Sequence, residues 1–128
     1  MKFFSKCIIF ICTLLWASNV AAQTKLNPTA FENMLKTLGS SAQLIDVRTA
    51  EEFVLDRLEN AQNLNLRDSD FKDRLKALDK TKPILVYCAA GGRSLKTMEM
   101  LTKFGFKEIF ELEGGINAWI EQEKPLAK

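Results

Sequence analysis

A short apolar run, Ile84-Leu85-Val86-Tyr87, leads directly into the loop Cys88-Ala89-Ala90-Gly91-Gly92-Arg93-Ser94, after which a helical pattern begins. This order places a thiol on a turn between a strand and a helix. The same alternation of strand-like and helix-like segments extends from Asn27 onward. It predicts an α/β domain with a mostly parallel central sheet that is flanked by helices on both faces.

Apolar spacing and turn residues predict the individual elements. Helices are expected over 28–38, 50–58, 71–78, 95–102 and 116–121, and strands over 43–47, 61–66, 84–87 and 107–112. Pro28 and Gly39 suit the two ends of the first helix, and Asp68-Ser69 is expected to cap the third. Trp119 and Ile120 are expected on the apolar face of the last helix. Without an internal repeat or a second pattern, residues 23–128 are expected to form one domain.

The first 22 residues form a separate segment. Lys2 and Lys6 give it a basic start, 8–17 are mostly apolar, and Val20-Ala21-Ala22 places small residues before Gln23. This pattern is typical of a secretory signal peptide that is cleaved after residue 22. The apolar run is shorter than the roughly 20 residues of a membrane-spanning helix. We expect export to the periplasm of a Gram-negative bacterium without membrane contact after cleavage; retention as an uncleaved tether is the alternative.

Removal of this segment changes the number of cysteines and the balance of charge. Of the three cysteines, Cys7 and Cys12 belong to it, which leaves Cys88 as the single thiol of the mature chain and excludes an internal disulfide. Without Lys2 and Lys6 the 18 basic residues become 16, equal to the 16 acidic residues. A balanced charge gives no support for binding to nucleic acid or to a membrane surface. A single thiol on a glycine-containing loop favours reactivity over inert burial.

The loop supplies what a nucleophilic cysteine needs. A free cysteine is mostly protonated, so donors and positive charge must favour its thiolate. The helix N-terminus offers unpaired backbone N–H groups, and the glycines let several of them point at one sulfur or oxyanion. We therefore predict Cys88 as the catalytic residue. The residues expected to bind the substrate's sulfur or an oxyanion are the rest of the loop: Ala89, Ala90, Gly91, Gly92, the cationic Arg93 and the potential helix cap Ser94.

The strand, the Cys-Ala-Ala-Gly-Gly-Arg-Ser loop and the helix resemble the active site of the rhodanese sulfurtransferase family. Two further segments resemble its signatures: Leu44-Ile45-Asp46-Val47-Arg48 followed by Glu51-Glu52-Phe53, and Leu112-Glu113-Gly114-Gly115-Ile116-Asn117-Ala118-Trp119. The three motifs occur in the family's order from about Phe31 to Trp119. The resemblance implies a rhodanese-like fold, and the signal-peptide pattern makes the chain look like a single-domain exported member, similar to periplasmic thiosulfate sulfurtransferases.

The family's mechanism is a ping-pong transfer of sulfur. The resemblance implies that the Cys88 thiolate takes the outer sulfur of a donor such as thiosulfate. The amides of 89–93 would hold the resulting persulfide until cyanide, a thiol or an acceptor protein removes the sulfur. No metal or organic cofactor is required, and no nucleic acid is expected as a partner. The chain also contains no histidine, the usual general base.

Two other classes of function stay open. Related phosphatases and arsenate reductases place five residues between cysteine and arginine, whereas four, Ala89 to Gly92, lie between them here. The shorter loop suits one sulfur atom better than a tetrahedral oxyanion, so these enzymes are the weaker alternative. A non-enzymatic persulfide carrier or a redox-sensing binding module would use the same thiol together with a partner.

Several residues around the loop have open roles. Asp46 and Arg48 are expected mainly to support the fold, with Arg48 pairing with Glu51 or Glu52. Arg93 is expected either to contact substrate or to stiffen the loop by pairing with a carboxylate such as Glu51.

The chain departs from the family in one segment. Many members carry Gly-His-Ile-x-Gly-Ala where Asp56-Arg57-Leu58-Glu59-Asn60-Ala61 stands here. Asn60 tolerates positive φ, so the turn is expected to persist. Arg57 in place of histidine leaves the role of that position open.

Overall fold

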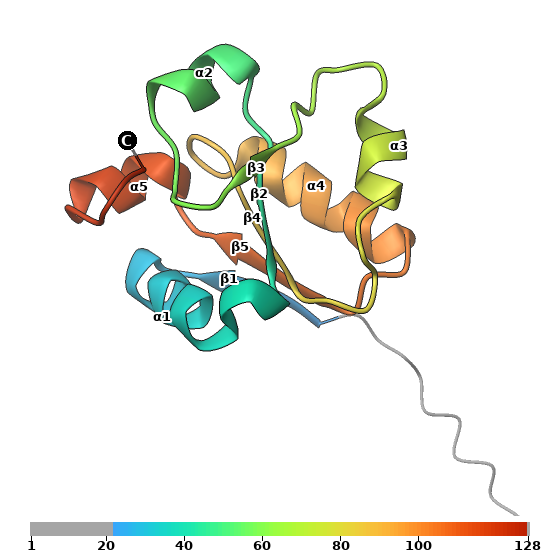
Figure 1. Cartoon of the computed structure of the whole chain (residues 1–128), viewed down its shortest axis with the longest axis horizontal. Helices are drawn as coiled ribbons and strands as arrows, with labels where there is room; N and C mark the ends of the chain where they lie inside the picture. Colours follow the sequence, from blue (N-terminus) through green and yellow to red (C-terminus); the bar gives the residue numbers. More distant parts are fainter. Residues whose placement is uncertain (1–21, 128) are drawn as a thin grey trace, which may run out of the picture.

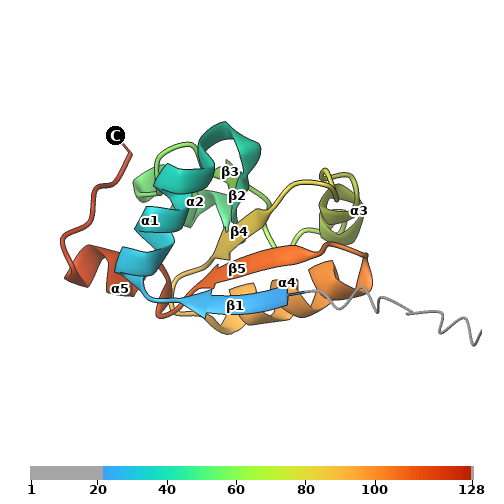
Figure 2. The ribbon, with the colours of Figure 1, turned by 90° about the horizontal axis from the view of Figure 1, so that it is seen from below.

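The computed structural model describes residues 22–127, which form a central sheet covered by helices (Figures 1 and 2). The five strands pair in the order β1-β5-β4-β2-β3, and each pairing is parallel. Their bounds are β1 Ala22–Leu26, β2 Gln43–Asp46, β3 Gln62–Asn63, β4 Ile84–Tyr87 and β5 Glu108–Leu112. The predicted fold class is confirmed.

Helices connect these strands. They are α1 Pro28–Leu38, α2 Ala50–Leu55, α3 Phe71–Lys76, α4 Gly92–Lys103 and α5 Gly115–Glu121, and a short 3-10 turn, Gly39–Ser41, follows α1. Buried residues of α3 and α4 share one core cluster with the sheet, and those of α1 and α5 share a second. Figure 2 shows α1 and α4 on opposite sides of the strands. None of the helices within 22–127 is long and apolar enough to cross a membrane.

The apolar sequence of β4 follows from its central position. Ile84 and Val86 belong to the cluster formed with α3 and α4, whereas Leu85 and Tyr87 belong to the one formed with α1 and α5. All four side chains are fully buried. Because successive side chains of a strand point to opposite faces, a strand covered on both sides must be apolar throughout. Cys88 therefore follows the best-packed strand of the sheet.

The carboxyl ends of the parallel strands meet at one edge of the sheet. Cys88 follows β4 there, Val47 follows β2, and Glu113 follows β5. Figure 1 shows α2, the loop after β4 and the beginning of α5 gathered at this edge. In open parallel α/β sheets this edge is where ligand sites form.

The structure confirms several predicted turns and helix ends. Pro28 is the first residue of α1, and Asn27 caps that helix by accepting a hydrogen bond from the Ala30 N–H at 2.9 Å. Gly39 ends the helix with a φ of 52°. Asn60 has a φ of 65°, so the turn survives the loss of the family's glycine.

Some strands and helices differ from the prediction. Strand β1 was not expected, and it pairs with β5 along its full length. The expected strand over 61–66 is reduced to β3, and the expected helix over 50–58 ends at Leu55. Beyond β3 the backbone still follows β2, because Leu64 N–H donates to Asp46 O at 2.9 Å and Leu66 N–H donates to Val47 O at 3.2 Å. Isolated hydrogen bonds to a loop replace the regular ladder there.

Two expectations about side chains were wrong. Asp68-Ser69 does not cap α3: the N-cap is Asp70, its side chain makes no capping bond, and Phe71 N–H donates to the Asp68 carbonyl at 3.1 Å. Trp119 is 3% exposed as expected, but Ile120 is 42% exposed because the short α5 buries a narrow face. The predicted signal segment lies outside the described residues apart from Ala22, the first residue of β1.

Candidate functional site

Residues 88–94, called the reactive loop because of the predicted role of Cys88, join β4 to α4. Cys88 follows Tyr87 directly, and α4 begins at Gly92. The Gly91 N–H donates to Cys88 Sγ at 3.0 Å, and a Ser94 Oγ lies 3.3 Å from the same sulfur. Gly91 has a φ of 123°, a conformation that L side chains rarely adopt. The glycine therefore turns the backbone so that its amide points at the thiol.

Hydrogen bonds around Cys88 favour its thiolate. Burial alone would raise the pKa of this thiol, because a charged sulfur loses water contact. Donation from the Ser94 hydroxyl and from the backbone N–H groups of Ser94, Gly91 and Ala90 outweighs burial, so the net pKa lies below the ordinary value of cysteine. A larger fraction of thiolate follows at neutral pH.

The residues of the reactive loop differ in their exposure to solvent. Cys88, Gly91 and Ser94 are buried, whereas Ala90 and Gly92 are exposed. Ala90 and Gly92 therefore form the outer surface of the loop, and Cys88 lies beneath that surface.

Arg93 pairs with a carboxylate on α2. Its Nη1 and Nη2 donate to Glu52 Oε1 and Oε2 at 2.7 and 3.0 Å. Arg93 thus pairs with a carboxylate, as one of its two expected roles required, but the partner is Glu52 and not the suggested Glu51, because the α2 capping box turns Glu52 back to Thr49. The Arg93 guanidinium, with further bonds from Thr49, lowers the pKa of Glu52 to about 2. This bidentate pair ties the first turn of α4 to α2.

Ser94 contacts a buried carboxylate that the sequence reasoning did not single out. Its Oγ lies 2.8 Å from Glu111 Oε1 on β5 and 3.0 Å from the Gly91 carbonyl. Glu111 is 1% exposed, and burial raises the pKa of its carboxyl group. An acidic residue at a buried strand position was the available signal.

The beginning of α5 holds the other half of the loop. The Ile116 N–H donates to the Cys88 carbonyl at 2.9 Å, and the Asn117 N–H donates to the Ala89 carbonyl at 3.1 Å. Gly115 has a φ of 62°, and a Cβ there would lie 2.4 Å from the Ala89 oxygen. The Gly-Gly pair therefore permits close contact between α5 and the backbone of the reactive loop.

Asp46 and Arg48 brace the neighbouring loop and do not contact the thiol. Arg48 Nη2 donates to Asp46 Oδ2 at 2.8 Å, and Nη1 donates to Asp56 Oδ1 at 2.9 Å. Pairing of Arg48 with Glu51 or Glu52 was therefore wrong. Asp46 also accepts from the Arg48 backbone N–H at 2.9 Å, so these groups fix the chain just after β2.

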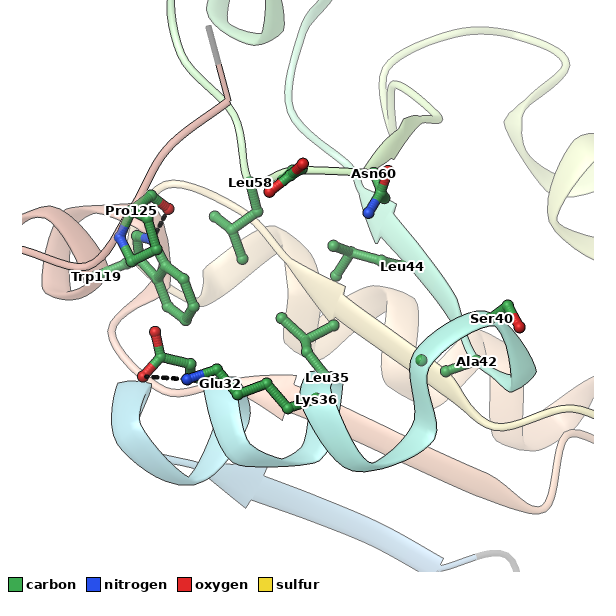
Figure 3. A pocket seen from close by; sticks show the side chains of 12 residues that line it. Glu32, Leu35, Lys36, Ser40, Ala42, Leu44, Leu58, Asn60, Trp119 and Pro125 are labelled. Carbon is green, nitrogen blue, oxygen red and sulfur yellow. Dashed lines mark hydrogen bonds and ion pairs between the residues drawn. The ribbon is translucent and has the colours of Figure 1, made fainter.

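A cavity lies away from the reactive loop. It has a volume of about 570 Å³ and opens between α1, the turn at 58–60 and Trp119 of α5 (Figure 3). Leu35, Leu44 and Leu58 contribute its apolar walls, and none of 88–94 lines it. The described residues also contain no group of three or more potential metal ligands.

The fold and site define a class of α/β proteins with an activated cysteine on a strand-to-helix loop. Residues 27–122 match the family model of the rhodanese-like domain, and the chain belongs to this family. It is 32% identical over 113 residues to the uncharacterized protein YqhL of Bacillus subtilis. The aligned region covers 88% of each chain.

A sulfurtransferase and a solved structure that resemble this chain support the same assignment. The thiosulfate sulfurtransferase GlpE of Coxiella burnetii is 33% identical over 76 residues, covering 59% of this chain and 69% of the relative. A rhodanese-related protein of Thermoplasma volcanium superposes with a TM-score of 0.69 and 29% identity, covering 81% of this chain and 97% of that one.

Proposed function

We propose that the protein is a sulfurtransferase that carries sulfane sulfur as a persulfide on Cys88. The observation that carries this proposal is the surroundings of one buried sulfur: the Gly91 N–H donates to it at 3.0 Å, and the Ser94 hydroxyl, which can donate or accept, lies 3.3 Å away. Such donors stabilise an anion on sulfur before and after transfer. The similarity to a thiosulfate sulfurtransferase supports the same chemistry.

Thiosulfate is the donor class that we propose. The Cys88 thiolate attacks the outer sulfur and forms a new S–S bond, the S–S bond of thiosulfate breaks, and sulfite leaves with the electron pair. A thiophile, either cyanide or a thiol, then attacks the outer sulfur of the persulfide and returns the thiolate. The four-residue spacing between Cys88 and Arg93 supports this chemistry over phosphate or arsenate chemistry.

Intact-mass measurement tests the proposal. Purified protein incubated with thiosulfate should gain the mass of one sulfur atom and lose it on addition of cyanide, with stoichiometric thiocyanate. Cys88→Ser is the matched control and should gain nothing. Equal gain by Cys88→Ser, or no gain by wild type, refutes the mechanism; Cys88-dependent release of phosphate from an aryl phosphate favours the phosphatase alternative.

A protein acceptor is the second candidate, and an exposed apolar pair favours it. Val54 and Leu55 at the end of α2 are 74% and 85% exposed, on the helix whose Glu52 holds Arg93. A carrier that delivers sulfur to a protein needs a contact surface beside its active loop. Val54→Ser with Leu55→Ser should leave transfer to cyanide unchanged and slow transfer to the partner; equal slowing of both contradicts this candidate.

We also propose that the domain acts in the periplasm after cleavage following Ala22. The basic start, apolar run and small residues before Gln23 support export. Cleavage there leaves most of β1 in the mature chain. Intact mass of protein from a periplasmic extract tests the proposal: a mass beginning at Gln23 is expected, and full-length protein confined to the cytoplasm contradicts it.

A further inference from the structure

A buried carboxylate lies behind the reactive thiol, linked to it by one hydroxyl. Ser94 Oγ is 3.3 Å from Cys88 Sγ and 2.8 Å from Glu111 Oε1. Cys88 and Glu111 are each 1% exposed, and Ser94 is fully buried. A hydroxyl has one proton to donate, so Ser94 can serve the sulfur, the carboxylate or the Gly91 carbonyl, but one at a time. The protonation of Glu111 therefore decides what Ser94 can offer to the sulfur.

None of the ion pairs formed by residues 22–127 includes Glu111. On β1, Lys25 favours its ionised form, whereas Glu113, just beyond β5, opposes it. On α4, Arg93 interacts with the charge of Cys88, but its guanidinium is bound by Glu52. Two anions on either side of Ser94 would therefore repel each other in a buried, weakly screened setting.

We propose that Glu111 is a positioning residue that accepts the proton of Cys88 through Ser94. In the thiol state the S–H donates to Ser94 Oγ, and Ser94 donates to the Glu111 carboxylate. Transfer moves the thiol proton to Ser94 and the former Ser94 proton to Glu111. The resulting carboxylic acid donates to Ser94, which now donates to the anionic sulfur.

This relay keeps one negative charge on the cluster throughout sulfur loading. A Cys88 thiol, the Glu111 carboxylate and thiosulfate give a persulfide anion, a Glu111 carboxylic acid and sulfite, so protons and charge balance. The inference rests on the proposed function for its role in turnover. It also supplies a proton acceptor in a chain that contains no histidine.

Coupled titration gives the relay a distinct signature. Two groups that share a proton lose their protons in two macroscopic steps, and the second step is raised because it creates two adjacent anions. The fraction of thiolate at Cys88 should therefore rise in two steps with pH in the wild type. With Glu111→Gln the second titrating group is gone, and the amide can still donate to Ser94, so a single step at lower pH is expected.

The experiment measures the rate of Cys88 alkylation by iodoacetamide against pH, with peptide mass mapping to follow this cysteine alone. Glu111→Gln should abolish the second step and move the midpoint of full ionisation down by about one pH unit. Glu108→Gln, which removes the same charge from an exposed position of β5, is the matched control and should retain the wild-type profile. In a Ser94→Ala background, the shift caused by Glu111→Gln should fall to less than half.

Two results overturn the relay: a single step in the wild type, or an equal effect of Glu111→Gln with and without Ser94. The wild-type profile decides the matter even if a variant does not fold. No sulfur donor is present in this measurement, so a two-step profile with no thiosulfate loading refutes the proposed function alone. Loading with a one-step profile refutes the relay alone.

Discussion

Gly115 determines how closely α5 approaches the reactive loop. A Cβ at this position would lie 2.4 Å from the Ala89 oxygen and 2.5 Å from the Cys88 oxygen. Both oxygens are backbone atoms that accept hydrogen bonds from the first turn of α5, at 3.1 Å for Ala89 and 2.9 Å for Cys88. They cannot rotate away as the end of a flexible side chain can. Gly115→Ala must therefore separate α5 from the loop that carries Cys88.

The expected cost has two parts. Gly115 has a φ of 62°, and an alanine in this left-handed region costs about 1–2 kcal/mol. Displacing packed backbone costs about 1–3 kcal/mol more. The sum is a loss of about 2–5 kcal/mol in the free energy of unfolding. Gly105→Ala isolates the first part, because Gly105 has a φ of 93° at the end of α4 and no atom within 4 Å of its built Cβ.

Urea unfolding followed by circular dichroism measures both losses, and intact mass measures the rate of sulfur loading from thiosulfate. Gly115→Ala should destabilise the protein by about 1–3 kcal/mol more than Gly105→Ala. It should also slow loading, because the Cys88 and Ala89 carbonyls lose their donors, whereas Gly105→Ala should load at the wild-type rate. Equal destabilisation by the two substitutions, with normal loading in both, refutes this reasoning.

Three further substitutions test the ion pairs around the site. Asp46→Asn should lower the free energy of unfolding by about 3 kcal/mol in urea, because it leaves buried Arg48 short of a partner, and a loss below 1 kcal/mol contradicts this. The folded-state pKa of Glu52, about 2, lies below its ordinary 4.5. Its stabilisation is therefore present above pH 4.5 and lost as pH falls towards 2, so Glu52→Gln should remove this part of the acid dependence of the urea midpoint. Arg93→Lys and Glu52→Gln should show a coupling of about 1 kcal/mol in a double-mutant cycle, because both break the same bidentate pair; additivity contradicts it.

Local signals explain which parts of the fold could be predicted. The β4 run is apolar at each position because both faces are covered, and Pro28 and Gly39 bound α1 by rules that need no tertiary information. Strand β1 lacks such a signal: its burial alternates weakly, and it exists because it pairs with β5, far along the chain. Strand β3 is short for a similar reason, since loop contacts with the end of β2 take over its hydrogen bonds.

The partner of Arg93 could have been predicted from the sequence, although only its neighbour Glu51 was suggested as an example. Thr49 and Glu52 have the spacing of a capping box, in which the acidic residue turns back to the helix start. Glu51 has no such constraint and is exposed. Recognising the cap therefore distinguishes two adjacent carboxylates that charge alone cannot separate.

Glu111 shows what periodicity can and cannot reveal about a site. Residues two apart on a strand share a face, so Glu111 lies on the same face of β5 as Ile109, which belongs to the core cluster beneath α4. A carboxylate on that face requires a partner, because an unpaired buried charge is strongly unfavourable. The strand pattern alone thus indicates a functional or structural anomaly at Glu111. Glu111 lies next to Ser94, and Ser94 lies next to Cys88, because α4 packs against β5. Only the tertiary structure shows this packing.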